Sequence, residues 1–371
     1  MEAEAQVAHA QGNSPVLISV PHGGSFRGDA KEYETRVGSA DVRAFCVDPD
    51  KDSLELAAEI SARFFTATGL RPYVVGALLH RSKCDFNREP AHAYPPGCAA
   101  SAASYKRYHS LLARAAEECT QRFGRCLVLD LHGQSHDPVT ELGYLLPRSV
   151  LDASSDADLD RLPLKHSSLS ALLSPFSNYS TLTSTPSSST ADPTADGSGA
   201  PHQQELPVSL SQLVRGDCSF GAFLVARGFL SCPSPLLPSP SVQPLCTVAT
   251  SRDGLSVPAG PHATHHPHAP RQARHCGCCA GCCDALLARC CAKHTFYSGG
   301  HITRTFGRLS GVVAIQAETP LLLRESPHFR RAFAKAMALS LADFLVRHRF
   351  MPQIDPLLAA PLLHHAARLS S

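Results

Sequence analysis

Several polar side chains stand where apolar runs of this sequence end. They are His22, Asp130, His132, Gln316 and Glu318. Two histidines and a carboxylate are a familiar ligand set for catalytic zinc, and they leave one position open for water. A nearby glutamate can take a proton from such a water. These residue types therefore predict metal-dependent hydrolysis, provided that the ends of the runs meet in the fold.

A second polar group follows another apolar run and contains Arg81, Asp85, Asn87 and Arg88. Arginines in such a place can hold an anionic substrate through charge-assisted hydrogen bonds. Each residue also has a plainer interpretation. A histidine after a strand is often only a satisfied polar residue, and Asn87-Arg88 fits a solvated turn. Asp130 fits either a metal ligand or a carboxylate that orients His132.

The elements that must position these residues alternate along the chain. Continuous apolar runs predict strands at 16–20, 72–79, 126–132 and 312–318, and apolar residues at helical spacing predict helices at about 50–65, 105–123 and 327–348. Strands without polar alternation belong to a mostly parallel or mixed sheet that is covered on both faces. We therefore expect one three-layer α/β domain, with its chemistry at the carboxyl ends of the strands.

Two tracts interrupt this pattern. Sixteen of the 35 residues in 166–200 are Ser or Thr, and a second tract is rich in Pro and His. Such composition is typical of segments that do not fold. We expect unstructured insertions at 166–204 and 238–293 within one domain spanning 14–371, because long surface insertions cost little stability.

The overall composition excludes several classes. Hydrophobic residues make up 43% of the 371, charged residues only 18%, and the formal net charge is +2. A dedicated nucleic-acid binder usually has a strong basic excess. No apolar run approaches the ~18–20 residues that cross a membrane. The first residues, Met-Glu-Ala-Glu-Ala, lack the apolar segment of a secretory signal, so a cytoplasmic location is the default expectation.

Cysteines suggest a non-enzymatic alternative. Seven of the 15 lie in 276–291, where the sequence is CGCCAGCCDALLARCC. Thiolates at this density could bind zinc or copper, as in a metallothionein-like protein. The block lacks the paired C-x₂-C modules with a folding spacer that mark structural zinc domains. Low-complexity sequence is the competing interpretation.

The chain resembles the N-formylglutamate amidohydrolases, which belong to the wider zinc-carboxypeptidase-like group. The resemblance covers about 14–150, 206–236 and 294–350, and rests on motifs that occur in a fixed order. These are Pro21-His-Gly-Gly24, Asp50 with Ser53-Leu54, Arg81 with Asp85-Phe-Asn-Arg88, Leu129-Asp-Leu-His-Gly133, Glu141-Leu-Gly-Tyr144, Cys218-Ser-Phe-Gly221, Pro233-Ser-Pro235, Gly299-Gly-His-Ile-Thr-Arg304 and Ile315-Gln-Ala-Glu318.

The resemblance implies a role for each of eight residues. One divalent zinc ion would be held by His22, Asp50 and His132. Glu318 would be the general base and later the acid that protonates the leaving amine. Arg81 would polarise the scissile carbonyl or bind a second carboxylate. The carboxylate of a small anionic N-acyl amino acid, such as N-formyl-glutamate, would be held by Asn87, Arg88 and Arg304.

The sequence departs from the family pattern in three respects. Asp48 and Asp52 flank Asp50, so either could be the ligand instead. The two insertions are longer than the family needs. His301 stands where an aromatic residue is expected, which could alter specificity. The alternatives that keep the metal site are a deacylase of another N-acyl amino acid, a carboxypeptidase-like peptidase, and a catalytically idle relative. The presence of all three ligands and Glu318 argues against an idle relative.

Overall fold

A seven-stranded mixed sheet organises the protein. The computed structural model describes residues 6–38, 45–173, 208–242 and 296–350. The strand order is β1-β3-β2-β4-β7-β5-β6. The strands are β1 (Val7–Ala10), β2 (Val16–Val20), β3 (Tyr73–Ala77), β4 (Cys126–Gln134), β5 (Thr140–Gly143), β6 (Ser231–Cys232) and β7 (Val312–Pro320).

The four central strands, β3, β2, β4 and β7, run parallel to one another. Leu129 of β4 stands opposite Ile18 on one side and Ile315 on the other. Both neighbours and Leu129 itself are fully buried. The continuous apolar runs are therefore strands of a sheet with two covered faces, as the sequence predicts. The flanking strands β1 and β5 are antiparallel to their neighbours β3 and β7.

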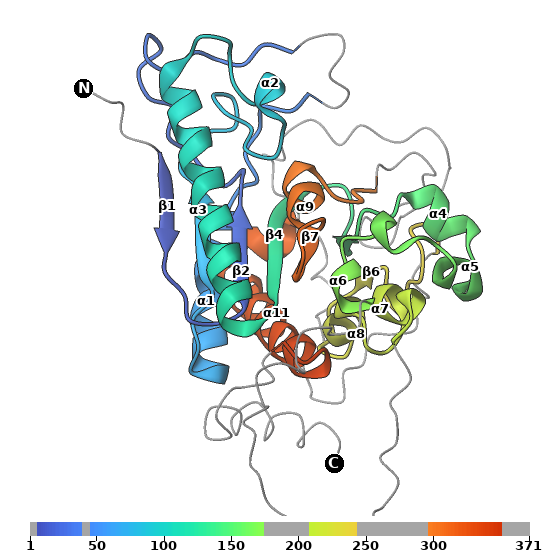
Figure 1. Ribbon diagram of the computed structural model, residues 1–371. Helices are drawn as coiled ribbons and strands as arrows, with labels where there is room; N and C mark the ends of the chain where they lie inside the picture. The colour runs from blue at the N-terminus through green and yellow to red at the C-terminus, as the bar shows by residue number, and fades with distance from the viewer. Residues whose placement is uncertain (1–5, 39–44, 174–207, 243–295, 351–371) are drawn as a thin grey trace, which may run out of the picture.

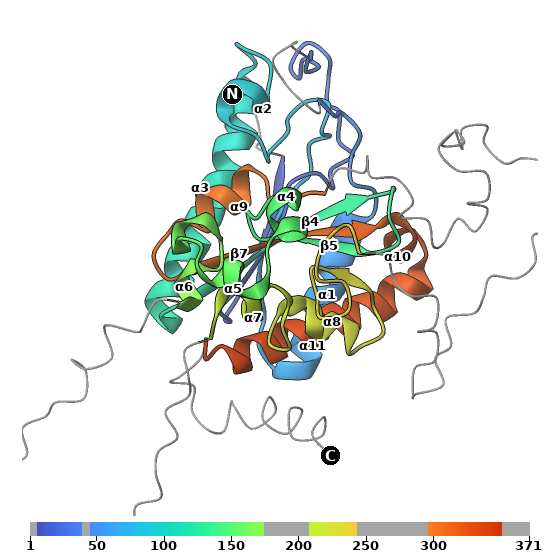
Figure 2. The same cartoon turned by 90° about the vertical axis from the view of Figure 1, so that its right-hand side faces the viewer.

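Helices cover both faces, which makes the fold a three-layer α/β domain (Figures 1 and 2). On one face α1 (Ser53–Thr68) packs against α11 (Pro327–Arg347), and on the other lie α3 (Ala99–Phe123) and α9 (His301–Phe306). Both α1 and α3 end where a glycine, Gly69 or Gly124, adopts a positive φ.

Short helices fill the connections. They are α2 (Pro90–Ala93), α4 (Arg148–Ala153), α5 (Asp156–Asp160), α6 (Ser170–Leu173), α7 (Leu210–Arg215), α8 (Phe220–Val225) and α10 (Leu321–Glu325), with a 3₁₀ turn, η1, at Leu164–His166. Across the described residues, no helix combines the length and the apolar character needed to cross a bilayer.

The first residues of both predicted tracts belong to the folded part of the protein. The expected unstructured tract starts at 166, but residues 166–173 are folded and reach the sheet. The Ser168 hydroxyl donates to the Ala314 carbonyl of β7 at 2.6 Å, and Ser168 O accepts from Ala314 N at 3.2 Å. Residues 238–242 are also described, and Ser239 is buried. The rest of both tracts, with the cysteine block at 276–291, lies outside the described residues.

One face of the sheet turns polar toward the carboxyl ends of its central strands. His132 of β4 stands opposite Glu318 of β7, and Glu318 stands opposite Glu141 of β5. Residues that face each other in register project to the same side of a sheet. Asp130 lies two residues before His132 and therefore shares this side. The candidate chemistry is thus concentrated on one edge of one face.

Candidate metal and catalytic site

Three side chains from separate segments converge in one buried cluster. His22 follows β2, Asp50 precedes α1, and His132 lies in β4. The Nδ1 atoms of His22 and His132 are 3.1 Å apart. Asp50 Oδ2 lies 3.3 Å from His22 Nδ1 and 3.1 Å from His132 Nδ1. All three residues are at least 94% buried, and within the described segments this is the group of His, Cys, Asp and Glu whose ligand atoms come close enough to hold an ion.

The triangle of donor atoms fits a zinc ion. Zinc bonds its nitrogen and oxygen ligands at about 2.0–2.2 Å in tetrahedral geometry, so neighbouring ligand atoms lie roughly 3.3–3.5 Å apart. The edges measured here, 3.1–3.3 Å, approach that spacing. Neither flanking carboxylate competes for the place of Asp50. Asp48 is exposed, and Asp52 lies 3.9 Å from Arg330.

Carboxylates hold the outer ring nitrogens of both histidines. His22 Nε2 is 2.6 Å from Asp85 Oδ1, and His132 Nε2 is 3.2 Å from Asp130 Oδ2. A carboxylate can only accept, so it favours a proton on the Nε2 that faces it. The lone pair of Nδ1 is then free to bind a metal, an arrangement common in metal sites. Of the two interpretations of Asp130 that the sequence leaves open, the geometry favours the orienting one.

Hydrogen bonds with three other segments hold the loop that carries Asp50. The backbone N–H of Asp50 donates to the His22 carbonyl at 2.9 Å, and Gly133 N donates to Asp50 Oδ2 at 3.1 Å. Arg324, 2% exposed, donates to the carbonyls of Lys51 and Thr319. Arg324 thereby connects the end of β7 to the residue that follows Asp50.

The charges of the cluster favour bound cations. Burial alone would raise the pKa of Asp50, but His22 and His132 hold that pKa well below its usual value. Burial works to lower the pKa of His132, yet Asp130 and Asp50 raise it well above its usual value. Because a metal and a proton compete for the same nitrogen, this environment stabilises positive charge of either kind.

Glu318 lies on the same face, directly across the β4–β7 ladder from His132. Its Oε1 accepts from Gln316 Nε2 at 2.9 Å, while Gln316 Oε1 accepts from Gly300 N at 2.6 Å. Burial raises the pKa of Glu318 to about 8, and Asp50 and Glu141 add to the rise although His132 opposes it. A carboxyl group with a pKa near neutrality can both take and return a proton.

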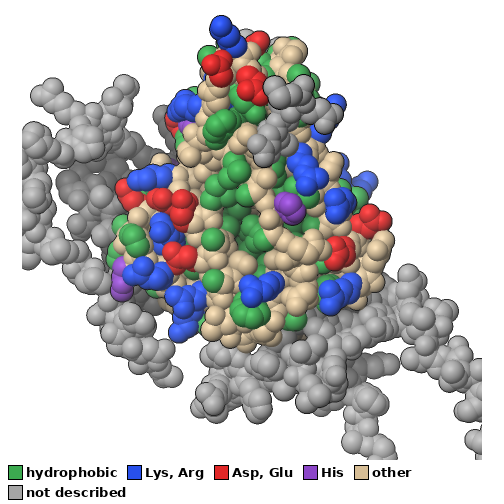
Figure 3. Space-filling view, turned by 90° about the vertical axis from the view of Figure 1, so that its left-hand side faces the viewer, with side chains coloured by type: hydrophobic (Ala, Val, Ile, Leu, Met, Phe, Trp, Pro, Cys, Tyr) green, Lys and Arg blue, Asp and Glu red, His purple; other side chains and the backbone are tan. Residues whose placement is uncertain are grey.

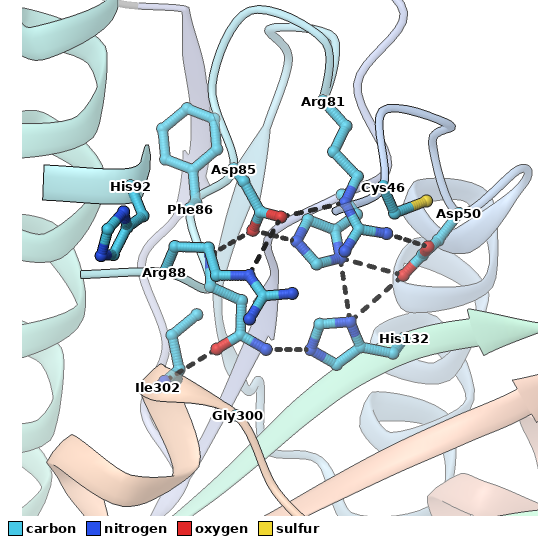
Figure 4. Close-up of polar contacts among 12 residues, drawn as sticks. Cys46, Asp50, Arg81, Asp85, Phe86, Arg88, His92, His132, Gly300 and Ile302 are labelled. Atoms are coloured by element: carbon cyan, nitrogen blue, oxygen red, sulfur yellow. Dashed lines mark hydrogen bonds and ion pairs between the residues drawn. The ribbon is translucent and has the colours of Figure 1, made fainter. Parts of the chain in front are cut away.

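Three further polar residues that the sequence singles out lie beside the cluster (Figure 4). Arg81 Nη1 is 3.5 Å from Asp50 Oδ1 and its Nε donates to Asp85 Oδ2 at 3.1 Å. The side chain of Arg88 is one-third exposed, with Nε 3.7 Å from the same Asp85 oxygen. Asn87 Nδ2 is 3.0 Å from His132 Nε2. The guanidinium groups of Arg81 and Arg88 thus place positive charge beside the cluster.

Arg304 stands apart from these contacts. Its side chain is exposed on α9, where its backbone N–H donates to the Gly300 carbonyl. His301, at the start of the same helix, has Nε2 3.4 Å from the Tyr105 hydroxyl and its ring 5.6 Å from that of His109. Among the described residues, Arg304 therefore forms no ion pair with the cluster.

Sequence reasoning assigned no role to four buried residues that position the site: Asp85, Glu141, Gln316 and Arg324. Asp85, Glu141 and Gln316 lie within the motifs, and Asp85 and Gln316 stand close to residues with assigned roles. Arg324 had no such signal, because its partners are backbone carbonyls far away in the sequence.

Comparisons with solved structures give distant likenesses. No family model and no curated protein matches the chain. The chain is similar to the crystal structure of an N-formylglutamate amidohydrolase from Ralstonia eutropha JMP134, at 14% identity and a TM-score of 0.42, over 94% of this chain and 99% of that one. It is also similar to a gene product of Agrobacterium tumefaciens, at 20% identity and a TM-score of 0.28, over 37% of this chain and 62% of that one. With both TM-scores below 0.5, the function has to be argued from the residues of the site.

Proposed function

We propose that this protein is a zinc-dependent amidohydrolase that cleaves the N-formyl group of N-formyl-glutamate, or the acyl group of a similar N-acyl amino acid. The observation that carries the proposal is the buried triangle of His22, Asp50 and His132, whose outer ring nitrogens face carboxylates. Such pairing turns three lone pairs toward one point, which is costly in a buried site unless a cation lies there.

Glu318 handles the proton in this proposal. Bound zinc supplies a Lewis acid that activates water and polarises the amide carbonyl. Glu318 accepts the proton that the attacking water loses and delivers it to the amide nitrogen as the C–N bond breaks. Formate and the free amino acid are then the products. The hydrogen bond from Gln316 fixes one oxygen of Glu318 and leaves the other for this work.

Cationic groups bind the substrate. Negative charge develops on the carbonyl oxygen during attack, and the Arg81 guanidinium beside Asp50 is placed to stabilise it. Asn87 and Arg88 hold a carboxylate of the substrate. Asn87 Oδ1 accepts from the backbone N–H of Ile302 at 2.8 Å, so the NH₂ group of Asn87 is the part of this side chain that faces the cluster. Arg304 contributes from the rim.

The first test measures zinc content and formate release from N-formyl-L-glutamate together. The full chain should bind one zinc per molecule and release formate, and chelation should abolish the release. Glu318→Gln keeps size and hydrogen bonding but removes the base, so kcat should fall by a factor on the order of 10² to 10⁴ while zinc is retained. A Glu318→Gln variant with unchanged kcat would rule Glu318 out as the base.

Arg88→Ala should behave differently from Glu318→Gln. A carboxylate anchor binds the ground state and the transition state alike, so its loss should raise KM and leave kcat nearly unchanged. If the zinc-loaded wild type spares N-formyl-glutamate but cleaves another N-acyl amino acid or a peptide, the zinc and Glu318 assignments stand and the substrate assignment is wrong.

A further inference from the structure

Asp85 is the most heavily contacted carboxylate of the site, and it is fully buried. Its Oδ1 accepts from His22 Nε2 at 2.6 Å and from the backbone N–H of Asn87 at 3.0 Å. Its Oδ2 accepts from Arg81 Nε at 3.1 Å. Figure 4 shows Arg81 and Arg88 reaching Asp85 from different sides.

Two more guanidinium groups lie at ion-pair distance from Asp85 Oδ2. Arg88 Nε is 3.7 Å away and Arg36 Nη1 is 3.8 Å away. Arg36 is itself buried, and it donates to the backbone carbonyls of Cys46 and Arg81. Every neighbour of the Asp85 carboxylate in these contacts is therefore a donor or a cation.

Only a carboxylate satisfies such surroundings. An ionised carboxylate offers two accepting oxygens and no proton, whereas a side-chain amide must present its NH₂ group on one side. At position 85 that NH₂ would face either His22 and the Asn87 N–H or the guanidinium groups. Either placement sets donor against donor in a buried site and leaves hydrogen bonds unmade.

We propose that Asp85 is a positioning residue that couples the metal site to the substrate-binding arginines, by holding His22 with one oxygen and Arg81 and Arg88 with the other. The coupling rests on the proposed function, because the roles of the metal and of the arginines come from it. Asp85 itself touches neither the reacting atoms nor the ion, and acts through its neighbours.

Asp130 provides a matched control, because it supports the other histidine and, within the described part of the chain, forms no ion pair with an arginine. Asp130 Oδ2 faces His132 Nε2 at 3.2 Å and Thr303 Oγ1 at 3.4 Å, and Oδ1 accepts from the Ser19 hydroxyl at 2.9 Å. Hydroxyl groups can donate or accept, so they can adapt to an amide. Asp130→Asn should therefore change the affinity for zinc and not the affinity for the substrate carboxylate.

The experiment compares Asp85→Asn and Asp130→Asn with the wild type in two binding measurements. The first is zinc affinity, obtained by competition with a chromogenic chelator. The second is calorimetric binding of glutarate, a dicarboxylate without an amide bond, to zinc-saturated protein. Asp85→Asn should lower the affinity for zinc by a factor on the order of 10 to 100. It should also lower the affinity for glutarate about tenfold, as expected for one lost charge-assisted hydrogen bond. Asp130→Asn should lower the affinity for zinc but leave the affinity for glutarate at the wild-type value.

The outcomes separate this inference from the proposed function. An Asp85→Asn variant with wild-type zinc affinity, or with weakened zinc and unchanged glutarate binding, overturns the coupling. A wild type that binds zinc and glutarate but hydrolyses neither N-formyl-glutamate nor any other N-acyl amino acid defeats the amidohydrolase assignment and leaves the coupling standing. A wild type that binds no zinc defeats both.

A measurement on wild-type protein covers the case in which Asp85→Asn fails to fold. If Asp85 holds His22 as described, His22 in the zinc-loaded protein should carry its proton on Nε2, which faces Asp85, and bind the metal through Nδ1. Imidazole ¹⁵N shifts report which nitrogen carries the proton, and the resonance missing from a His22→Gln variant identifies the residue. A zinc-loaded protein in which His22 binds the metal through Nε2 would contradict the proposed role of Asp85.

Discussion

Glu318 is a residue whose environment opposes the charge that its role requires. Burial and the nearby Asp50 and Glu141 raise its pKa to about 8 in the folded chain without metal. An unfolded chain would ionise this side chain near pH 4.5. The folded state therefore binds one more proton than the unfolded state at intermediate pH, and stability falls as the pH rises.

Glu318→Gln should therefore stabilise the metal-free protein at high pH. Below about pH 4 the glutamate is neutral in both states, so the two proteins should be equally stable. Between about pH 4.5 and 8 the wild type should lose free energy of unfolding relative to the variant, by up to roughly 1.4 kcal/mol per pH unit. Above pH 8 the difference should stay constant, on the order of a few kcal/mol.

Urea unfolding with a chelator present, at several values between pH 4 and 9, measures this difference. Glu325→Gln is the control, because the Glu325 side chain is exposed and pairs only with exposed Lys51. Its difference from the wild type should hardly vary with pH. A Glu318→Gln variant that is less stable than the wild type at pH 8 would contradict the assigned pKa and point to a structural ion pair.

At the scale of elements, the packing of α10 against the end of β4 controls the position of Asp50. The Arg324 guanidinium group occupies the space beside Gly133, where an added Cβ would come within 2.2 Å of it. The same guanidinium group donates to the Lys51 carbonyl, next to Asp50. Gly133 is therefore required by close approach and not by its backbone angle.

Gly133→Ala should weaken zinc binding more than it weakens the fold. The methyl group has to displace the Arg324 guanidinium, which loosens the Lys51 carbonyl and the Asp50 loop. We expect zinc affinity to fall at least about tenfold, in the range seen when groups that support ligands are lost. Gly97→Ala is the control. It introduces strain at a φ of +83° but meets no atom within 4 Å, so it should lower stability and leave zinc affinity unchanged. Equal zinc affinity in Gly133→Ala and wild type would exclude this role.

The sequence predicts the central elements well and the positioning contacts poorly. The runs at 16–20, 126–132 and 312–318 became β2, β4 and β7, since an unbroken apolar run has few alternatives to a buried strand. Strand β5 (Thr140–Gly143) was not predicted, because four residues are too few to show the hydrophobic periodicity of a strand. The convergence of His22 and His132 follows from parallel strand ends, whereas Asp50 was expected only from the family resemblance. The contact of Asp85 with His22 depends on a loop path that no local pattern encodes.

At the scale of the whole molecule, charge is spread without a dominant sign. Figure 3 shows the face at the β1 edge of the sheet, where Lys and Arg alternate with Asp and Glu around a strip of apolar side chains. This pattern agrees with a net charge of +2. Inside the site, Arg36, Arg81 and Arg88 instead surround one carboxylate, that of Asp85.

Two regions of the chain are candidates for metal binding, and mutation and deletion distinguish them. The buried triangle contains His22, whereas the cysteine block at 276–291 lies outside the described residues. If the triangle holds the catalytic zinc, deleting 276–291 should leave one chelator-sensitive zinc per molecule and leave formate release intact. His22→Ala should lose that zinc, because two remaining ligands bind far more weakly than three. Metal analysis of reduced protein by mass spectrometry, after dialysis against a weak chelator, gives both stoichiometries. Metal that disappears with the cysteine block but persists in His22→Ala would assign the binding to the thiolates and refute the site proposed for the enzyme.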